Sequence, residues 1–218
     1  MGPLTLSTPG VDRPPYLDWS VASAALEGQL ESGDLHLVKT IPSGMLLAVV
    51  DGLGHGAEAA AVARRAVETL AASSSESVIV LIRQCHAALR GSRGAVMSLA
   101  TLNVMEDTMT WIGVGNVEGV LARANMRASV PMESVVLRNG VVGLRLPTLN
   151  AAVVSIAPGD LLVFATDGIR HDFKRGLRSG PRPADLAGRI LADHRQEHDD
   201  ALVLVAEYRG AGDRGGSS

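Results

Sequence analysis

Short apolar runs separated by breaks of two or three residues dominate the chain, and such runs are typical of strands joined by tight turns. Parallel strands need a long crossover, so connections this short predict antiparallel hairpins. One hairpin is expected from Leu35 to Ile41 and Met45 to Val50, and a second from Met97 to Met105 and Thr108 to Val114.

Two later segments carry turn signals of the same kind. The run Ser134 to Leu137 is followed by Asn139-Gly140, the dipeptide favoured in two-residue hairpins, which predicts that the chain turns back there. Ala151 to Ile156 and Leu161 to Ala165 flank Pro158-Gly159-Asp160, which predicts a further hairpin. The final run, Ala201 to Tyr208, predicts one more buried strand.

Three segments place apolar residues at helical spacing. The first runs from Gly56 to Ala72, and the third from Pro183 to about His194 with proline in its first turn. The second is expected to begin at once, with Ser73-x-x-Glu76 as a capping box, and to carry the lone Cys85 on its apolar stripe. Two helices after a hairpin, several antiparallel strands, one more helix and a last strand predict α+β layers rather than alternating βαβ units.

Composition limits the classes of protein to consider. With 218 residues, of which 46% are hydrophobic and 20% charged, the chain predicts one folded domain over residues 16–208, between a loose segment 1–15 and a disordered tail 209–218. The formal charge of -3 gives no basic surplus for nucleic acid or an anionic membrane, and no apolar run approaches the length of a membrane span. A single cysteine suits a reducing compartment, so a cytoplasmic location is expected. The protein is also expected to be a monomer.

Aspartates stand at the ends of the predicted strands. In antiparallel sheets the end of one strand and the start of its neighbour share an edge, so these carboxylates are able to converge on one rim. Clustered carboxylates repel one another unless cations neutralise them, and Mg²⁺ or Mn²⁺ are the natural partners of oxygen-only ligands. A single Asp-Gly pair is more often a simple turn, so only the whole set carries the metal hypothesis. The set comprises Asp34, Asp51, Asp167, Asp199 and Asp200.

Four short stretches resemble, in order and spacing, the motifs of the PPM (type 2C) family of metal-dependent protein Ser/Thr phosphatases, and within it the bacterial sporulation and stress-response branch. The resemblance implies an α-β-β-α sandwich of two antiparallel sheets flanked by helices. The four stretches are Gly33-Asp34, the segment 49–56 around Asp51-Gly52, Ala165-Thr166-Asp167-Gly168 and Asp199-Asp200.

The resemblance also implies a site with two Mn²⁺ or Mg²⁺ ions. Asp51 would bridge them, with Asp34 and the carbonyl of Gly52 on one ion and Asp167 and Asp199 on the other. Asp200 is an alternative ligand. Asp51 and Asp167 would be the catalytic residues, since they would hold the ions that activate the attacking water.

The same resemblance implies a substrate. Small members of this branch that consist of a catalytic domain alone act on phosphoserine and phosphothreonine of STAS-domain scaffold proteins in the stressosome. The basic stretch between Arg170 and Arg182 is either a solvated loop or a docking edge for such an acidic or phosphorylated partner.

Several positions depart from the family pattern. Leu202 stands where the last motif usually has threonine, and Asn116 stands where many relatives have an aspartate linked to a third metal ion. His55 lies four residues after Asp51 and is either a general acid or a residue at the start of a helix. No motif identifies a phosphate-binding arginine.

Two other functions compete with the phosphatase hypothesis. Residues Gly52 to Ala57 satisfy the G-x-G-x-x-A fingerprint of dinucleotide-binding oxidoreductases, although no acidic residue follows at the expected distance and the later hairpins supply no parallel sheet. A non-catalytic regulator with the phosphatase fold, which binds a phosphoprotein without hydrolysing it, is the second alternative.

Overall fold

The computed structural model describes residues 14–125 and 130–211. Most of the expected loose segment 1–15 and of the expected tail 209–218 therefore lies outside the described residues. Arg209 is nevertheless held in place, because its backbone N–H donates to the carbonyl of Tyr16 and its guanidinium pairs with Asp18 at 2.7 Å. The ordered chain thus continues past the predicted end of the domain.

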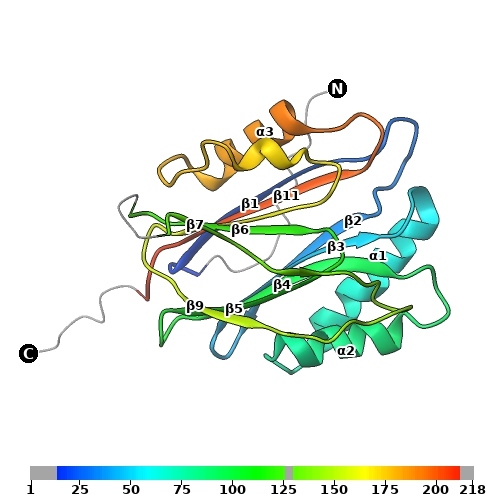
Figure 1. Ribbon diagram of the computed structural model, residues 1–218, viewed down its shortest axis with the longest axis horizontal. Coiled ribbons are helices and arrows are strands. Elements are labelled where there is room, and N and C mark those ends of the chain that lie inside the picture. Colours follow the sequence, from blue (N-terminus) through cyan, green and yellow to red (C-terminus); the bar gives the residue numbers. More distant parts are fainter. Residues whose placement is uncertain (1–13, 126–129, 212–218) are drawn as a thin grey trace, which may run out of the picture.

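The described strands form two sheets (Figure 1). The first has the order β1-β11-β10-β6-β7, and the second has the order β2-β3-β4-β5-β8 with β9 also paired to β5. The strands are β1 (Leu17–Ala24), β2 (Asp34–Ile41), β3 (Gly44–Gly52), β4 (Ala95–Asn103), β5 (Thr108–Val114), β6 (Glu118–Ala122), β7 (Met132–Ser134), β8 (Leu137–Arg138), β9 (Ala152–Ser155), β10 (Leu161–Ala165) and β11 (Ala201–Tyr208).

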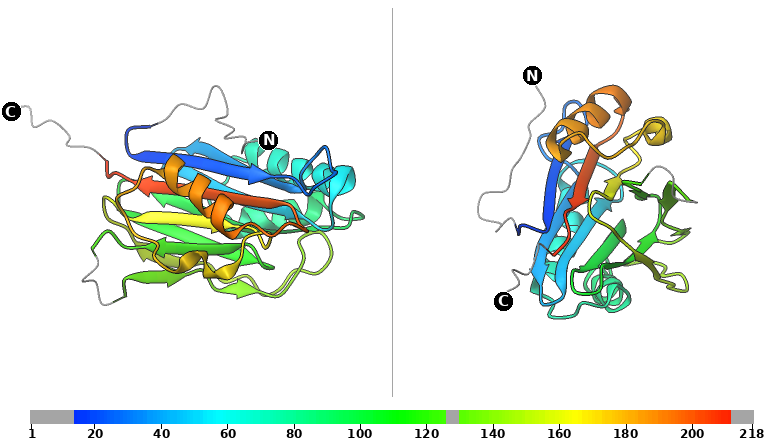
Figure 2. Two further views of the ribbon diagram at one scale, coloured as in Figure 1. Left: turned by 90° about the horizontal axis from the view of Figure 1, so that it is seen from above. Right: turned by 90° about the vertical axis from the view of Figure 1, so that its left-hand side faces the viewer.

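Helices cover the outer face of each sheet, so the chain forms four layers (Figure 2). Helices α1 (Gly56–Ala72) and α2 (Val78–Ala88) pack on the second sheet, and α3 (Pro183–His194) and the 3-10 turn η1 (His171–Lys174) pack on the first. Between the sheets lies a core that includes Trp19, Leu47 and Phe164. The α-β-β-α sandwich is confirmed, and each sheet buries both faces, which explains the continuous apolar runs of the central strands.

Most of the predicted elements are present. The hairpins β2–β3 and β4–β5 are antiparallel as expected, α1 and α3 have the predicted bounds, and β11 is the final buried strand. Strands β1 and β6 were not expected from the sequence. Their segments carry isolated polar residues such as Asp18 and Glu118, which obscure the apolar run although the strands lie against the core.

Two of the predicted hairpins are wrong, because the chain changes sheets where they were expected. β7 pairs with β6 in one sheet, whereas β8 pairs in parallel with β5 in the other, so nothing folds back at Asn139-Gly140 onto β8. Likewise β9 pairs with β5, whereas β10 lies between β11 and β6. A turn-forming sequence fixes a local reversal of direction, but it does not fix which sheet receives the next strand.

The second helix begins later than its capping box predicts. Ser73 ends α1, with its backbone N–H bonded to the carbonyl of Leu70, and its hydroxyl accepts the N–H of Ser75 instead of capping a new helix. The helix starts after Ser77. Cys85 is fully buried between α2 and the sheet, as its place on the apolar stripe predicts.

The sheet around β3 rules out the dinucleotide-binding hypothesis. β3 precedes the glycine-rich segment and α1, but it pairs antiparallel with both of its neighbours, β2 and β4. The dinucleotide fingerprint requires a parallel βαβ unit, and the described strands on either side of α1 and α2 are antiparallel. No helix within residues 14–125 and 130–211 is long and apolar enough to span a bilayer.

Candidate metal centre

Two of the predicted aspartates face each other on neighbouring strands. Asp34 is the first residue of β2, and its register partner on β3 is Asp51, one residue before that strand ends. Asp34 is buried and Asp51 is half-buried. The shared edge that antiparallel pairing predicts is therefore formed, and it brings two carboxylates into one desolvated place.

Each Asp-Gly pair is required by close backbone packing rather than by a simple turn. A Cβ atom at Gly52 would lie 2.2 Å from the carbonyl oxygen of Ala59 in α1. A Cβ at Gly168 would lie 1.8 Å from the carbonyl oxygen of Asp200. Glycine at both positions lets a neighbouring backbone approach, so each preceding aspartate sits at a fixed point on the rim.

Thr166 links the edges of the two sheets. It follows β10 in the first sheet, and its buried hydroxyl donates a hydrogen bond of 2.7 Å to Oδ2 of Asp34 in the second. The hydroxyl oxygen of Thr166 also accepts the backbone N–H of Leu202 at 2.9 Å. The position next to Asp167 is therefore tied to the position of Asp34 through one side chain.

The two consecutive aspartates before β11 have different environments. Both carboxylate oxygens of the buried Asp200 accept backbone N–H groups, from Leu26 at 2.7 Å and from Gly33 at 2.8 Å. Asp199 is half-buried, and one of its oxygens accepts only the N–H of the next residue. Asp200 thus anchors the loop that leads into Asp34, whereas Asp199 presents its carboxylate to the cleft.

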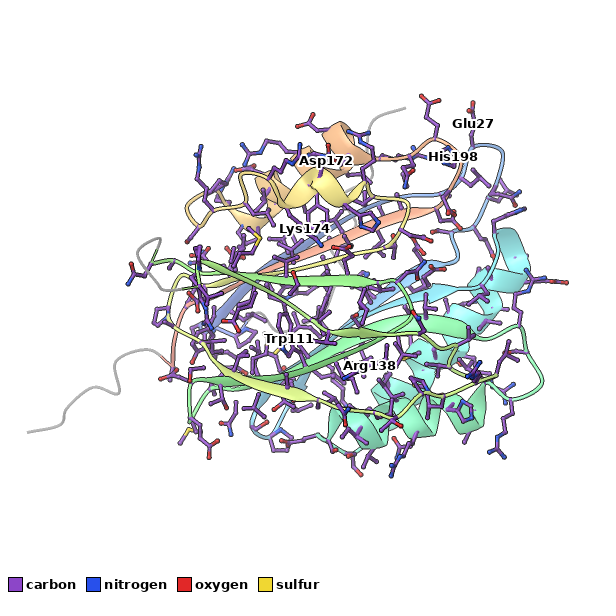
Figure 3. All side chains as sticks on the ribbon, viewed as in Figure 1. Glu27, Trp111, Arg138, Asp172, Lys174 and His198 are labelled. Carbon is purple, nitrogen blue, oxygen red and sulfur yellow. The ribbon has the colours of Figure 1, made fainter. Side chains whose placement is uncertain are left out.

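An acidic cleft of about 420 Å³ lies at this rim. Figure 3 labels His198, which precedes Asp199, and Glu27, in the loop that Asp200 anchors, at the same end of the molecule. None of the described residues that line the cleft is Lys, Arg or His. They are Asp51, Leu53, Gly54, Val96, Gly115, Asn116, Asn139, Gly140, Val141, Asp167 and Asp199.

Two further residues hold Asp167 in position. The side-chain amide of Asn116 donates a hydrogen bond of 2.6 Å to Oδ2 of Asp167, and the amide of Gln196 donates to its backbone carbonyl at 2.6 Å. Sequence reasoning noted Asn116 only as a departure and missed Gln196 and the role of Thr166. His55 is exposed at the start of α1 and does not line the cleft.

The carboxylates raise one another's pKa. Burial is the main cause for Asp34, whose pKa rises to about 8 although the hydroxyl of Thr166 opposes the shift, and the neighbouring aspartates raise it further. Burial and then the charges of the other four aspartates raise the pKa of Asp51 to about 9. Burial and Asp167 raise the pKa of Asp199. No cation contributes to the shift at Asp34 or Asp51. At Asp199 the neighbouring His198 opposes the rise. The two most strongly shifted carboxylates therefore have no counter-charge among the described residues.

This donor set fits a hard divalent cation in its chemistry. It offers only carboxylate and carbonyl oxygens, and two of its acids are desolvated without a cationic partner, which is costly unless an ion compensates them. Within the described part of the chain, no three His, Cys, Asp or Glu side chains stand ready-made around one point. Binding would therefore draw the carboxylates inward, as expected for side chains that repel one another without an ion.

Comparisons with known proteins agree with this architecture. Residues 42–209 match the family model described as "Stage II sporulation protein E (SpoIIE)". The chain is 24% identical over 185 residues to "Phosphoserine phosphatase RsbX" of Bacillus subtilis (strain 168), which covers 83% of this chain and 89% of that protein.

Solved structures share the fold over nearly the whole chain. One, described as "The bacterial stressosome: a modular system that has been adapted to control secondary messenger signaling", is 29% identical with a TM-score of 0.78 and covers 88% of this chain and 99% of its own. Another, RsbX in complex with magnesium, is 22% identical with a TM-score of 0.79 and covers 91% of this chain and 98% of its own.

Proposed function

The chain belongs to the Stage II sporulation protein E (SpoIIE) family, and we propose that it is a metal-dependent phosphatase of phosphoserine and phosphothreonine in proteins. The observation that carries this proposal is the meeting of Asp34, Asp51, Asp167 and Asp199 around one edge, where no described cation acts on Asp34 or Asp51 and none lines the cleft. The similarity to a phosphoserine phosphatase supports the same activity.

We propose that the site holds two Mn²⁺ or Mg²⁺ ions. Asp34 and the carbonyl of Gly52 would bind one ion, Asp167 and Asp199 the other, and Asp51 both. When bound, such ions supply Lewis acidity toward phosphate oxygens and make water a stronger nucleophile at neutral pH. Four carboxylates also balance the charge of two divalent cations.

The protein's own contribution is to orient the ligands and the substrate. Thr166 fixes one oxygen of Asp34, and Asn116 fixes one oxygen of Asp167. Each carboxylate therefore keeps its other oxygen free to bind a metal ion. Asp200 holds the loop before Asp34 through two backbone N–H groups. We therefore assign Asp200 a positioning role and prefer Asp199 as the ligand.

A water molecule, rather than a side chain, is the proposed nucleophile. No Ser, Thr, Cys or His is among the described residues that line the cleft, and Cys85 is fully buried between α2 and the sheet. Direct attack of water on phosphorus needs positioning and charge stabilisation, and no covalent intermediate on the protein. His55 is exposed outside the cleft, so we do not assign it a catalytic role.

For the substrate we propose phosphorylated STAS-domain scaffold proteins of a stressosome in the cytoplasm. The support is the likeness to the stressosome structure at 29% identity and to RsbX. Dephosphorylation would reset the signalling complex. We expect the phosphatase itself to act as a monomer, which sedimentation velocity can test.

The experiment is a side-by-side phosphate-release assay with Mn²⁺. The substrates are a phosphoserine STAS protein, an unrelated phosphoserine peptide and a phosphotyrosine peptide. We expect the STAS protein to be hydrolysed fastest and the phosphotyrosine peptide slowest. Equal rates on both phosphoserine substrates would contradict the STAS assignment, hydrolysis of phosphotyrosine alone would contradict the Ser/Thr specificity, and tight binding without any hydrolysis would favour the non-catalytic regulator.

A further inference from the structure

A second depression lies between α3 and the segment that follows η1, outside the acidic cleft. It has a volume of about 160 Å³. In Figure 3, Asp172 and Lys174 mark η1, which lies beside α3 on the outer face of the first sheet. The floor is apolar and buried, and the rim is polar. The floor comprises Phe173, Leu177, Leu186 and Ile190, and the rim includes Arg175, Arg178, Arg189, Asp193 and His194.

The structure divides the basic stretch between Arg170 and Arg182 into paired and unpaired groups. Lys174 pairs with Glu118, Arg170 pairs with Asp172 at 3.6 Å, and Arg182 pairs with Asp185 at 3.0 Å. These three cations are already compensated within the protein, so they carry little attraction for a partner.

Three other arginines are exposed on the groove rim and form no ion pair with any residue in the ranges 14–125 and 130–211. They are Arg175, Arg178 and Arg189. The charge of Arg175 acts on Asp172, so Arg178 and Arg189 are the two that remain free for a partner. Arg189 comes from α3, so the fold adds it to two arginines of the loop. The groove rim thus concentrates positive charge in a protein whose overall formal charge is -3.

The groove ends close to the metal rim along the chain. At the His194 end, the carbonyl of His194 accepts the N–H of Arg170, and two residues later the N–H of Gln196 donates to the carbonyl of Gly168 at 2.8 Å. Gly168 directly follows Asp167. The His194 end of the groove therefore lies close to the edge where the phosphate would be hydrolysed.

We propose that this groove docks an acidic segment of the phosphoprotein substrate and buries one large apolar side chain of that segment. The identification of the partner as the substrate rests on the proposed function. The free Arg178 and Arg189 complement acidic side chains, with Arg175 beside them, and the apolar floor accepts one side chain. At about 160 Å³ the groove is smaller than the roughly 300–1,000 Å³ of typical small-molecule sites.

The acidic cleft gives an independent reason for such a docking groove. It presents carboxylates and no described Lys, Arg or His, and two bound divalent cations would only balance the carboxylates that hold them, so the cleft has no surplus positive charge to attract an acidic protein surface. A separate basic groove would supply that attraction and raise the local concentration of the phosphate at the rim. The groove would thus bind the substrate protein, and the acidic cleft would be the place where the phosphate is hydrolysed.

Peptide binding tests the groove without any catalysis. The probe is a fluorescein-labelled peptide of glutamate and aspartate with a single leucine, followed by fluorescence anisotropy at low and high salt in EDTA. We expect the wild type to bind it, and Arg178→Glu and Arg189→Glu each to weaken binding at least about tenfold. The control is Arg83→Glu, which reverses the charge of an exposed arginine on α2 in the opposite layer and is expected to leave binding unchanged.

Three results would contradict the proposal that the groove docks an acidic segment. They are absence of binding to the wild type, equal weakening by Arg83→Glu, and unchanged binding when the leucine of the peptide is replaced by serine. Thermal unfolding of each variant checks that the fold is intact. An intact fold is expected because the three substituted residues, Arg83, Arg178 and Arg189, are all exposed.

Kinetics separate this proposal from the proposed function. In the Mn²⁺-loaded protein, the two groove variants should raise KM for a phosphoprotein at least fivefold and leave turnover of p-nitrophenyl phosphate unchanged. Unchanged KM for the phosphoprotein would contradict the docking role. A wild type that binds the peptide but hydrolyses neither substrate would contradict the phosphatase function and retain the groove.

Discussion

The hydroxyl of Thr166 donates a 2.7 Å hydrogen bond to the buried carboxylate of Asp34, and so connects the end of β10 in one sheet with the start of β2 in the other. The two residues are 132 positions apart in the sequence. Because the same hydroxyl oxygen accepts the N–H of Leu202, one side chain fixes three strands at the metal rim. The first prediction follows from this contact.

Thr166→Val keeps the shape of the side chain and removes its hydroxyl. The N–H of Leu202 and one oxygen of Asp34 then lose their partner in a buried place, so the free energy of unfolding should fall by about 1–3 kcal/mol. Urea unfolding measures it. Thr166→Ser keeps the hydroxyl and should be the more stable of the two variants; if valine is tolerated better than serine, the hydrogen bonds do not stabilise this edge.

The metal-free protein should lose stability as the pH rises. In the folded state the pKa of Asp34 rises from 3.8 to about 8, and that of Asp51 from 3.8 to about 9. Between pH 3.8 and the raised pKa of each group, the folded state therefore holds a proton that the unfolded state has released. The stability this proton uptake provides is fully present below pH 3.8 and is lost as the pH rises through about 8 and about 9, by up to about 1.4 kcal/mol per pH unit for each proton.

Unfolding midpoints in EDTA across this pH range test the effect. Asp51→Asn cannot titrate, so its stability should fall less steeply than that of the wild type. Saturating Mg²⁺ competes with protons for the carboxylates and should remove the decline. A wild type whose stability in EDTA rises over the same range, relative to Asp51→Asn, would contradict the buried acid cluster.

Substitution of Asp200 should lower the metal-free stability, whereas substitution of Asp199 should hardly change it. Asp200→Ala leaves the N–H groups of Leu26 and Gly33 without their acceptor and should cost about 1–3 kcal/mol of stability even in EDTA. Asp199→Ala removes a half-buried carboxylate from a repelling cluster and should change the metal-free stability by less than about 0.5 kcal/mol.

The metal response distinguishes the two residues further. Mn²⁺ should raise the melting temperature of the wild type by mass action, and Asp199→Ala should lose most of that rise. If Asp199→Ala is strongly destabilised in EDTA and Asp200→Ala is not, the roles assigned to the two aspartates are reversed.

Asn116→Asp should make the protein more dependent on metal ions. The amide of Asn116 donates to Asp167 at 2.6 Å, and a carboxylate in its place would replace that bond with repulsion. We expect a lower melting temperature in EDTA and a larger increase on addition of Mn²⁺ than in the wild type. The matched control is Asn139→Asp, which adds the same charge to the same cleft and, at a residue that makes no described bond to Asp167, should change both values less. Equal changes in the two variants would mean that the bond to Asp167 has no special role.

Much of the site was accessible from the sequence because it lies at strand ends. Asp34 and Asp51 were expected on one edge, and β2 and β3 place them opposite each other. The resemblance to the PPM (type 2C) family is confirmed by the family match over residues 42–209. Aspartates at the ends of predicted strands, and the glycine that follows two of them, are local signals. They indicate which residues lie at the rim before the fold is known.

The contacts that cross between the sheets were not accessible. Thr166 reaches Asp34 at the edge of the other sheet, and no local pattern shows which strand ends of the two sheets will face each other. Gln196 and Asp167 both lie in the chain between β10 and β11 of the first sheet, but Gln196 too acts on a residue far away in the sequence. The wrong hairpins at Asn139-Gly140 and Pro158-Gly159-Asp160 have the same origin, because partner choice among strands is decided by packing of the two sheets. The free arginines of the groove could likewise be separated from the paired ones only in the folded structure.

The proposed metal centre is tested most directly by the initial rate of phosphate release from a phosphoserine protein. The rate is measured with Mn²⁺ and with EDTA, for the wild type and for Asp51→Asn. Asp51 faces Asp34 and lines the cleft, so its carboxylate is central to the proposed metal centre. We expect Mn²⁺ to support turnover in the wild type, EDTA to abolish it, and Asp51→Asn to lose at least about a hundredfold of the rate. Equal rates in Mn²⁺ and EDTA, or full Mn²⁺-stimulated activity in Asp51→Asn, would contradict it.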